Sequence, residues 1–187
     1  SFIEKWLQFN PVYNEFTAGQ SIIAESDPNF ETQFKSQEEI SNINGALINK
    51  FLQIQNAKGQ NDAELSAAIG VLHFISREYQ LALQSFDLCT KLDPLNYSYW
   101  NKLGATFAYL KNTEAALSCY HRTLDLKPNF VRGWVNVGIN YGLQESVEEA
   151  NLFYLNALAL NPEAKHLWNY IETNFGSMKD TSQFDDI

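Results

Sequence analysis

A polar stripe on one predicted helix face is the group in this sequence best suited to bind a ligand. Arg132, Asn136 and Asn140 follow one another at steps of four residues, and a further step of three reaches Leu143. Residues at these steps share one face of a helix. An asparagine side chain both donates and accepts hydrogen bonds, as an extended peptide backbone does, and an arginine can bind a carboxylate with two parallel bonds. The stripe therefore predicts a surface that binds a peptide.

The alternative interpretation is that these residues are ordinary exposed helix residues. Asparagine, however, is a poor helix former. Two asparagines inside one helix, aligned with Arg132, lower the local stability of that helix and bring no local gain. This observation favours a role in binding.

Catalysis finds no comparable support in the sequence. His73, His121 and His166 stand alone; we expect His73 in the core and the other two facing solvent. There is no GxGxxG loop, no HExxH pair and no nucleophile elbow. Cys89 and Cys119 form no CxxC pair, which favours two buried free thiols in a reducing compartment over a disulfide. We therefore expect a protein that is not an enzyme, with no metal and no cofactor.

The elements that must position the stripe follow from an internal repeat. Four residue classes recur at one interval, since 104 − 70 = 34 and 138 − 104 = 34 for the glycines. The classes are glycine (Gly70, Gly104, Gly138), alanine (Ala82, Ala116, Ala150), a large aromatic ring (Phe86, Tyr120, Tyr154) and proline (Pro94, Pro128, Pro162). This period and pattern indicate the tetratricopeptide repeat (TPR), a pair of antiparallel helices.

Each class has a packing role. Small Gly104 and Ala116 let the two helix backbones approach closely, and the ring of Tyr120 fills the space beside that contact. Pro128 follows the second helix and cannot continue its hydrogen-bond ladder. One repeat cannot bury its apolar face alone, but stacked repeats can. We predict an all-α fold: a right-handed TPR superhelix of tandem helix-turn-helix repeats with a C-terminal capping helix.

The register also divides the chain. Residues 1–11 reproduce the end of a second helix, so we expect the tail of a truncated upstream TPR repeat. Residues 12–36 have no helical period and the composition of a loop or disordered segment. Residues 37–62 predict a degenerate or hinge repeat helix, 63–164 three TPR repeats, and 165–187 the capping helix and a frayed tail.

Three helix starts can be recognised from their caps. Asp62 precedes the first full repeat, and Ser146 with Glu149 matches a capping box. Asn161 followed by Pro162 predicts the start of the capping helix.

Charge and hydropathy exclude other classes. The formal net charge of −9 argues against nucleic-acid binding, which requires a basic surface. No apolar run reaches the ~18 residues of a membrane span. The first ten residues lack the basic start and apolar core of a signal peptide. We expect a cytoplasmic protein with no transmembrane span.

In a TPR array the first helix of each pair lines an inner groove. The positions not needed for helix packing face this groove; in the central repeat they include Asn101, Ala105 and Tyr109. In the last repeat they are the polar stripe and Leu143. The predicted peptide-binding set is Asn101, Ala105, Tyr109, Arg132, Asn136, Asn140 and Leu143.

Three stretches resemble one TPR family closely. They are AELSAAIGVLHFISREYQLALQSF (63–86), YWNKLGATFA (99–108) and PNFVRGWVNVGINYG (128–142), with weaker similarity over 1–62. They are similar to the last three repeats of the peroxin-5 family, the peroxisomal import receptors for C-terminal targeting signals. The resemblance implies a cytoplasmic receptor that cycles to the peroxisomal membrane. Its partner would be the C-terminal Ser-Lys-Leu-type tripeptide of peroxisomal or glycosomal cargo.

The resemblance also implies roles for single residues. Asn101 and Asn136 would bind the backbone and terminal carboxylate of the signal, and Arg132 would act through its charge, directly or through water. Peroxisomal docking proteins would be contacted by segments outside this sequence. The family's first repeats form the opposite wall of the groove, so we expect this chain alone to bind a signal weakly.

Two positions depart from the family pattern. The family places further asparagines late in the first helices of its last two repeats, where this sequence holds Tyr109 and Leu143. Two lost amides remove hydrogen bonds worth ~0.5–1.5 kcal/mol each. We therefore expect either an altered signal or a divergent paralogue.

Two other functions stay open at this point. One is a structural TPR scaffold that organises a multiprotein complex and does not recognise a free C-terminus. The other is a chaperone adaptor that clamps an acidic C-terminal tail. The adaptor needs several Lys and Arg residues in its groove, and the pattern identifies only Arg132 there.

Overall fold

The structure is a computed structural model that describes residues 37–58 and 62–181 of the 187-residue chain. The predictions for residues 1–11 and 12–36, and for the end of the frayed tail, lie outside these residues. Within them the regular secondary structure is entirely helical. The helices are α3 (Gln37–Lys58), α4 (Ala63–Ile75), α5 (Tyr79–Leu92), α6 (Tyr97–Tyr109), α7 (Thr113–Leu126), α8 (Val131–Gly142), α9 (Val147–Leu160) and α10 (His166–Thr181).

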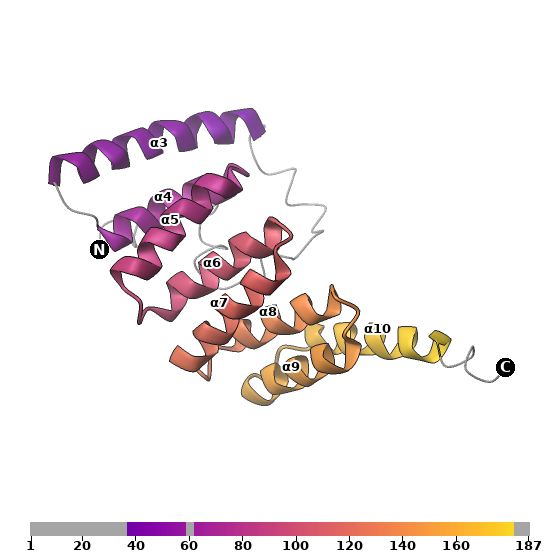
Figure 1. The fold of residues 1–187 in the computed structure, drawn as a ribbon. Helices are drawn as coiled ribbons and strands as arrows, with labels where there is room; N and C mark the ends of the chain where they lie inside the picture. The colour runs from indigo at the N-terminus through magenta and orange to yellow at the C-terminus, as the bar shows by residue number, and fades with distance from the viewer. Residues whose placement is uncertain (1–36, 59–61, 182–187) are drawn as a thin grey trace.

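The helices stack in chain order from α3 at one end to α10 at the other (Figure 1). Three pairs make the most extensive contacts, α4 with α5, α6 with α7, and α8 with α9. Each second helix also packs on the first helix of the next pair, and α10 packs on α9. The predicted all-α repeat fold is thereby confirmed.

The cap predictions have mixed outcomes. Asp62 Oδ1 accepts hydrogen bonds from the backbone N–H groups of Glu64 and Leu65 at 3.0 and 3.1 Å, as predicted. Asn161 Oδ1 accepts from Glu163 N at 3.3 Å, but only a turn follows. The capping helix α10 begins at His166, so the start predicted at Asn161 and Pro162 is wrong. The capping box at Ser146 is wrong, because the Ser146 side chain makes no capping bond to α9.

The turns inside the repeats share one backbone conformation. Arg77, Lys111 and Glu145, each one repeat apart, have positive φ angles of 63°, 59° and 61°. In this left-handed conformation the following amide turns back, so that Ser146 N donates to the Tyr141 carbonyl at 3.0 Å. The equivalent residue of the preceding repeat, Asn112, has the same turn and still accepts a capping bond from Ala115 N at 3.2 Å. The turn itself therefore does not explain why the Ser146 side chain makes no capping bond.

Tight glycine contacts hold each helix pair together. A Cβ atom added at Gly104 would lie 2.8 Å from Tyr120 Cε1, and one added at Gly138 would lie 2.6 Å from Tyr154 Cε1. Both rings are almost completely buried and have no room to withdraw. Each glycine is therefore needed for close approach of the two helices.

Substitution of Gly104 by alanine should test this contact. The added methyl group would overlap the ring of Tyr120, and overpacking of this kind lowers the free energy of unfolding by ~1–3 kcal/mol. Gly45→Ala in α3 is the matched control, since a Cβ atom there meets nothing within 4 Å. Alanine at that helical position should stabilise by ~0.5–1 kcal/mol. Urea unfolding followed by circular dichroism measures both, and equal midpoints would contradict the packing argument.

Candidate peptide-binding site

The predicted asparagines come together between two first helices. Asn136 of α8 donates from Nδ2 to Asn101 Oδ1 of α6 at 3.0 Å. Asn140 Nδ2 donates to the Asn136 carbonyl oxygen at 2.8 Å. All three side chains are buried, with exposed fractions of 4% for Asn101, 4% for Asn136 and 1% for Asn140. They are therefore not ordinary exposed helix residues, and they are more enclosed than a stripe facing an open groove.

This chain of amides is incompletely satisfied. Asn140 Oδ1 is buried and has no hydrogen-bond partner. Asn136 Nδ2 carries two hydrogens, of which one is directed to Asn101. In the part of the chain that the structure describes, Asn101 Nδ2 and Asn136 Oδ1 make no hydrogen bond. A ligand can therefore accept hydrogen bonds from Asn101 Nδ2 and from the second hydrogen of Asn136 Nδ2, and can donate one to Asn136 Oδ1.

Lys102 is a further candidate that the sequence analysis missed. Its ammonium group donates to Ser98 Oγ at 2.7 Å, and it forms no ion pair with any described residue. Burial lowers the pKa of Lys102 to about 8, the charge of Arg132 adds to that effect, and Cys89 opposes it. The Lys102 ammonium group has therefore lost part of its hydration and has no negatively charged neighbour to replace it.

The repeat register could have identified Lys102. It occupies the same repeat position as Asn136, since 136 − 102 = 34. In this register the stripe of the last repeat corresponds in α6 to Ser98, Lys102, Thr106 and Tyr109. The sequence analysis instead predicted Asn101, Ala105 and Tyr109 as groove-facing residues of this helix.

Arg132 is the second cation of the site. Its side chain is partly buried, and Nε is buried with no hydrogen-bond partner. The guanidinium carbon lies 5.6 Å from the centre of the Phe130 ring. Burial lowers the pKa of Arg132, and Tyr97 opposes that effect. Lys102 and Arg132 therefore place two positive charges on α6 and α8, the helices that carry Asn101 and Asn136, without a carboxylate to neutralise them among the described residues.

The three apolar members of the predicted set differ in their surroundings. Ala105 is buried at 3% exposure and is part of the helix packing. Tyr109 stacks on Tyr79 at a centroid distance of 5.1 Å, and 38% of it is exposed. Leu143 is 68% exposed at the end of α8. Only Tyr109 and Leu143 of these three present a surface to a ligand.

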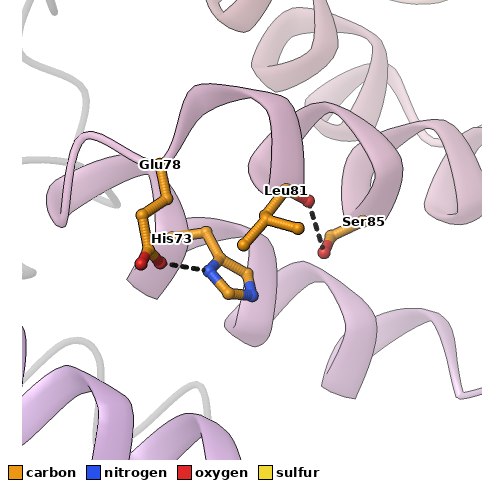
Figure 2. A network of polar contacts seen from close by, with 4 residues as sticks. All are labelled: His73, Glu78, Leu81 and Ser85. Atoms are coloured by element: carbon orange, nitrogen blue, oxygen red, sulfur yellow. Dashed lines mark hydrogen bonds and ion pairs between the residues drawn. The ribbon is translucent and has the colours of Figure 1, made fainter.

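The histidines do not form a site. His73 Nδ1 lies 2.6 Å from Glu78 Oε2, a contact that ties α4 to the start of α5, and beside it Ser85 Oγ donates to the Leu81 carbonyl (Figure 2). The His73 side chain is largely buried, in keeping with its predicted core position, whereas His121 and His166 are exposed as predicted.

The cysteines are both buried free thiols, as predicted. Burial raises the pKa of Cys89 and of Cys119 to about 12. A thiol with so high a pKa holds almost no thiolate near neutral pH and is a poor nucleophile.

The comparison with solved structures defines the class. The chain matches a structure described as "First TPR of Spaghetti (RPAP3) bound to HSP90 peptide SRMEEVD" with a TM-score of 0.60. The match covers 63% of this chain and 93% of that one at 19% identity, which concerns the fold alone. No protein-family model matches the chain. The chain is a TPR-like helical repeat protein.

Curated relatives narrow this class. The chain is 35% identical over 91 residues to a peroxisomal targeting signal receptor of Kluyveromyces lactis, and 30% identical over 119 residues to a peroxisomal targeting signal 1 receptor of Dictyostelium discoideum. These matches cover 49% and 63% of this chain, and 16% and 17% of the relatives. The chain is thus a relative of these receptors over about half of its length or more, and spans about a sixth of theirs.

Substitution of Lys102 should reveal the strain in the site. Lys102→Met removes a poorly solvated charge that Arg132 repels, so it should raise the free energy of unfolding at pH 7 by roughly 1–3 kcal/mol. The pKa of Lys102 is lower in the folded state (about 8) than its ordinary 10.5. The penalty is therefore complete below pH 8 and is relieved as the pH rises from 8 to 10.5.

The stabilisation by Lys102→Met should accordingly shrink when both proteins are unfolded in urea at pH 9.5. Lys102→Arg, which keeps the charge, is the control and should show no such gain at pH 7. A methionine variant that is less stable than the wild type at pH 7 would contradict a strained lysine.

Proposed function

We propose that this chain is part of a receptor that binds the free C-terminus of cargo proteins carrying a Ser-Lys-Leu-type peroxisomal or glycosomal signal. The observation that carries the proposal is the pair of unneutralised cations, Lys102 and Arg132, on the same two helices as the open amide groups of Asn101 and Asn136. A terminal carboxylate supplies the missing negative charge.

The charges explain why a carboxylate is the preferred ligand. Lys102 is partly buried and has exchanged part of its water for protein atoms, and the charge with the largest effect on it is that of another cation, Arg132. An anion placed between the two relieves both the lost hydration of Lys102 and the repulsion by Arg132. Hydrogen bonds between charged partners are about twice as strong as neutral ones.

The amides suit the terminal carboxylate and the peptide backbone that precedes it. Asn101 Nδ2 and the second hydrogen of Asn136 Nδ2 are donors, and Asn136 Oδ1 is an acceptor. The last residues of an extended chain offer carbonyl oxygens and N–H groups in alternation. Such contacts recognise the peptide backbone and its terminal carboxylate without changing the peptide chemically. The proposed activity is therefore binding and not catalysis.

The relatives supply the biological setting of the proposal. Their names describe receptors for peroxisomal targeting signals. A receptor of this type would bind cargo in the cytoplasm and cycle to the peroxisomal membrane, where docking proteins receive it. No helix of the described residues is long and apolar enough to cross a membrane.

Replacement of single asparagines tests the site. In the full-length protein, Asn136→Ala should weaken binding of a Ser-Lys-Leu peptide roughly tenfold or more, because it removes a bond to a charged group. Asn140→Ala should have a smaller effect on affinity, since Asn140 is buried and donates to the Asn136 backbone. Fluorescence anisotropy with a labelled peptide measures both.

An amidated peptide is the control for this test, because it lacks the terminal charge. The wild type should bind it weakly. The difference in affinity between the wild type and Asn136→Ala should be much smaller for this peptide than for the free-carboxylate peptide. If Asn136→Ala binds both peptides as the wild type does, the scaffold function would be the better interpretation.

The pH dependence of binding tests Lys102. Because burial lowers the pKa of Lys102 to about 8 in the free protein, the lysine loses its proton above that pH. A bound carboxylate favours the charged form, so binding then requires uptake of a proton. Affinity for the free-carboxylate peptide should fall by up to tenfold for each pH unit above about 8.

Lys102→Arg retains its charge and should show a much flatter profile over pH 7–9.5. A wild-type profile that matches that of Lys102→Arg would contradict the role of Lys102. A peptide ending in SRMEEVD, the ligand of the structural neighbour, tests the adaptor function in the same assay. Tighter binding of that acidic peptide than of Ser-Lys-Leu would favour an adaptor.

A further inference from the structure

The outer face of α9 is apolar, although it lies at the surface. Leu152, Leu155 and Ala159 follow one another at steps of three and four residues and so share one face of the helix. Leu152 is 59% exposed and Leu155 46%, and Ala159 is exposed as well. We call these three residues the α9 stripe. The opposite face, with Tyr154 and Ala157, is buried in the repeat. A helix that is apolar on both faces is typical of one that is covered on both.

The repeat register indicates that TPR packing does not require apolar residues at these positions. They can be compared with the other second helices, since 152 − 84 = 68 and 152 − 118 = 34. The equivalent residues are polar in both: Gln84, Asp87 and Lys91 in α5, and Ser118, His121 and Asp125 in α7. In α5, Lys91 Nζ donates to Asp87 Oδ2 at 2.6 Å in a surface ion pair. The α9 stripe replaces such an ion pair by Leu155 and Ala159, so a function outside the repeat is needed to account for it.

The capping helix leaves the α9 stripe uncovered. Asn174 of α10 donates from Nδ2 to Asn151 Oδ1 at 2.7 Å, and Tyr170 stacks on Tyr154 at a centroid distance of 5.5 Å. Asn151 and Tyr154 are both buried. Helix α10 therefore covers the side of α9 on which a further repeat would stack, and the stripe remains exposed to solvent.

Acidic residues begin the same face of α9. Glu148 precedes Leu152 by four residues and Glu149 precedes it by three, so both lie next to the α9 stripe. Both are exposed, and neither forms an ion pair within the part of the chain that the structure describes. Glutamates in a first turn also interact favourably with the helix dipole, which explains their presence but leaves their charges without a partner. The surface is therefore an apolar row with a negative end.

We propose that the α9 stripe is a docking surface for an amphipathic helix of a partner protein. The partner helix would have apolar side chains on one face and a lysine or arginine near Glu148 and Glu149. A helix suits the surface because residues at steps of three and four form ridges that pack into the grooves of another helix. The α9 stripe lies on a second helix, whereas the proposed peptide site lies on the first helices α6 and α8. The inference is therefore independent of the proposed function.

Charge argues against an occupant from this chain. Residues 1–36 and 182–187 are both net acidic by sequence: Glu4, Glu15, Glu25, Asp27, Glu31, Asp185 and Asp186 outnumber Lys5 and Lys35. A second copy of the chain would bring one formal charge of −9 against another. In each case like charges meet at Glu148 and Glu149 and repel. A basic helix of another protein supplies the opposite charge.

The experiment uses the full-length protein and a fluorescent model peptide of about eighteen residues. The peptide has leucines on one helical face and lysines on the other, and fluorescence anisotropy measures its affinity. The variant combines Leu152→Gln, Leu155→Asp and Ala159→Lys, which gives α9 the residues of the α5 surface and leaves the net charge unchanged. This variant should bind the lysine peptide at least tenfold more weakly, because the peptide leucines lose their apolar contacts. A variant that binds as tightly as the wild type would overturn the inference.

The fold of the variant can be checked independently, because the replaced side chains are exposed and α5 carries the new ones. Its thermal unfolding and its affinity for a Ser-Lys-Leu peptide should match those of the wild type. Leu81→Gln is the matched control, an exposed leucine on α5 with 43% exposure. It should leave the affinity for the lysine peptide unchanged, and an equal loss in this control would contradict a specific surface on α9.

Two further measurements test the choice of occupant. Glu148→Gln combined with Glu149→Gln should weaken binding of the lysine peptide by about fivefold. A peptide with glutamates in place of the lysines should bind the wild type weakly, and equal binding of the two peptides would contradict a basic partner. Sedimentation velocity tests a second copy as the occupant. A wild-type dimer that the triple variant abolishes would overturn the inference in favour of self-association.

Discussion

The contact between a glycine backbone and a buried aromatic ring determines the geometry of this molecule. Tyr120 lies so close to Gly104 that a single added carbon atom would overlap it, and the same arrangement recurs at Gly138. The distance between the two helices of a pair is therefore fixed by the absence of a side chain. Because each pair is built to the same distance, first helices of successive repeats come into register. That register brings α6 and α8 close enough for Asn136 to reach Asn101.

The site uses this rigidity to hold groups that the fold alone would not favour. Lys102 and Arg132 are positive, partly buried and free of acidic partners in the described residues. A helix pair could close more stably around methionine or leucine at these places. Stable packing elsewhere in the repeats compensates for the repulsion. The proposed site would be prepared for an anion before the anion arrives, so little reorganisation would accompany binding.

The fold could be predicted from the sequence because its main constraint is visible in residue types. Gly104 and Tyr120 recur in kind every 34 residues, and few other arrangements require that spacing. The conformation of the turns was harder to predict from the sequence. Glu145 adopts a left-handed conformation that its residue type does not suggest, and the side chain of Ser146 does not make the predicted capping bond.

The site could be predicted only in part. Spacing identified Asn101 and Asn136 as candidates, but their burial depends on how closely neighbouring repeats approach, which the period of one helix does not encode. The groove-facing positions of α6 were taken as those aligned with Asn101, and not as those 34 residues before the polar stripe of α8. Lys102 was therefore not predicted. The long stem of a lysine also lets its charge act away from its own Cα position.

The bond between Asn101 and Asn136 has a consequence for how the array opens. In stacked repeats each unit is stabilised mainly by its neighbours, and terminal units can fray independently. A hydrogen bond between residues 35 positions apart joins two such units into one cooperative element. A ligand that lies across both helices would strengthen the same connection. Slower amide hydrogen exchange would then spread through α6 to α9 together, so the proposed receptor, once occupied, would no longer open one repeat at a time.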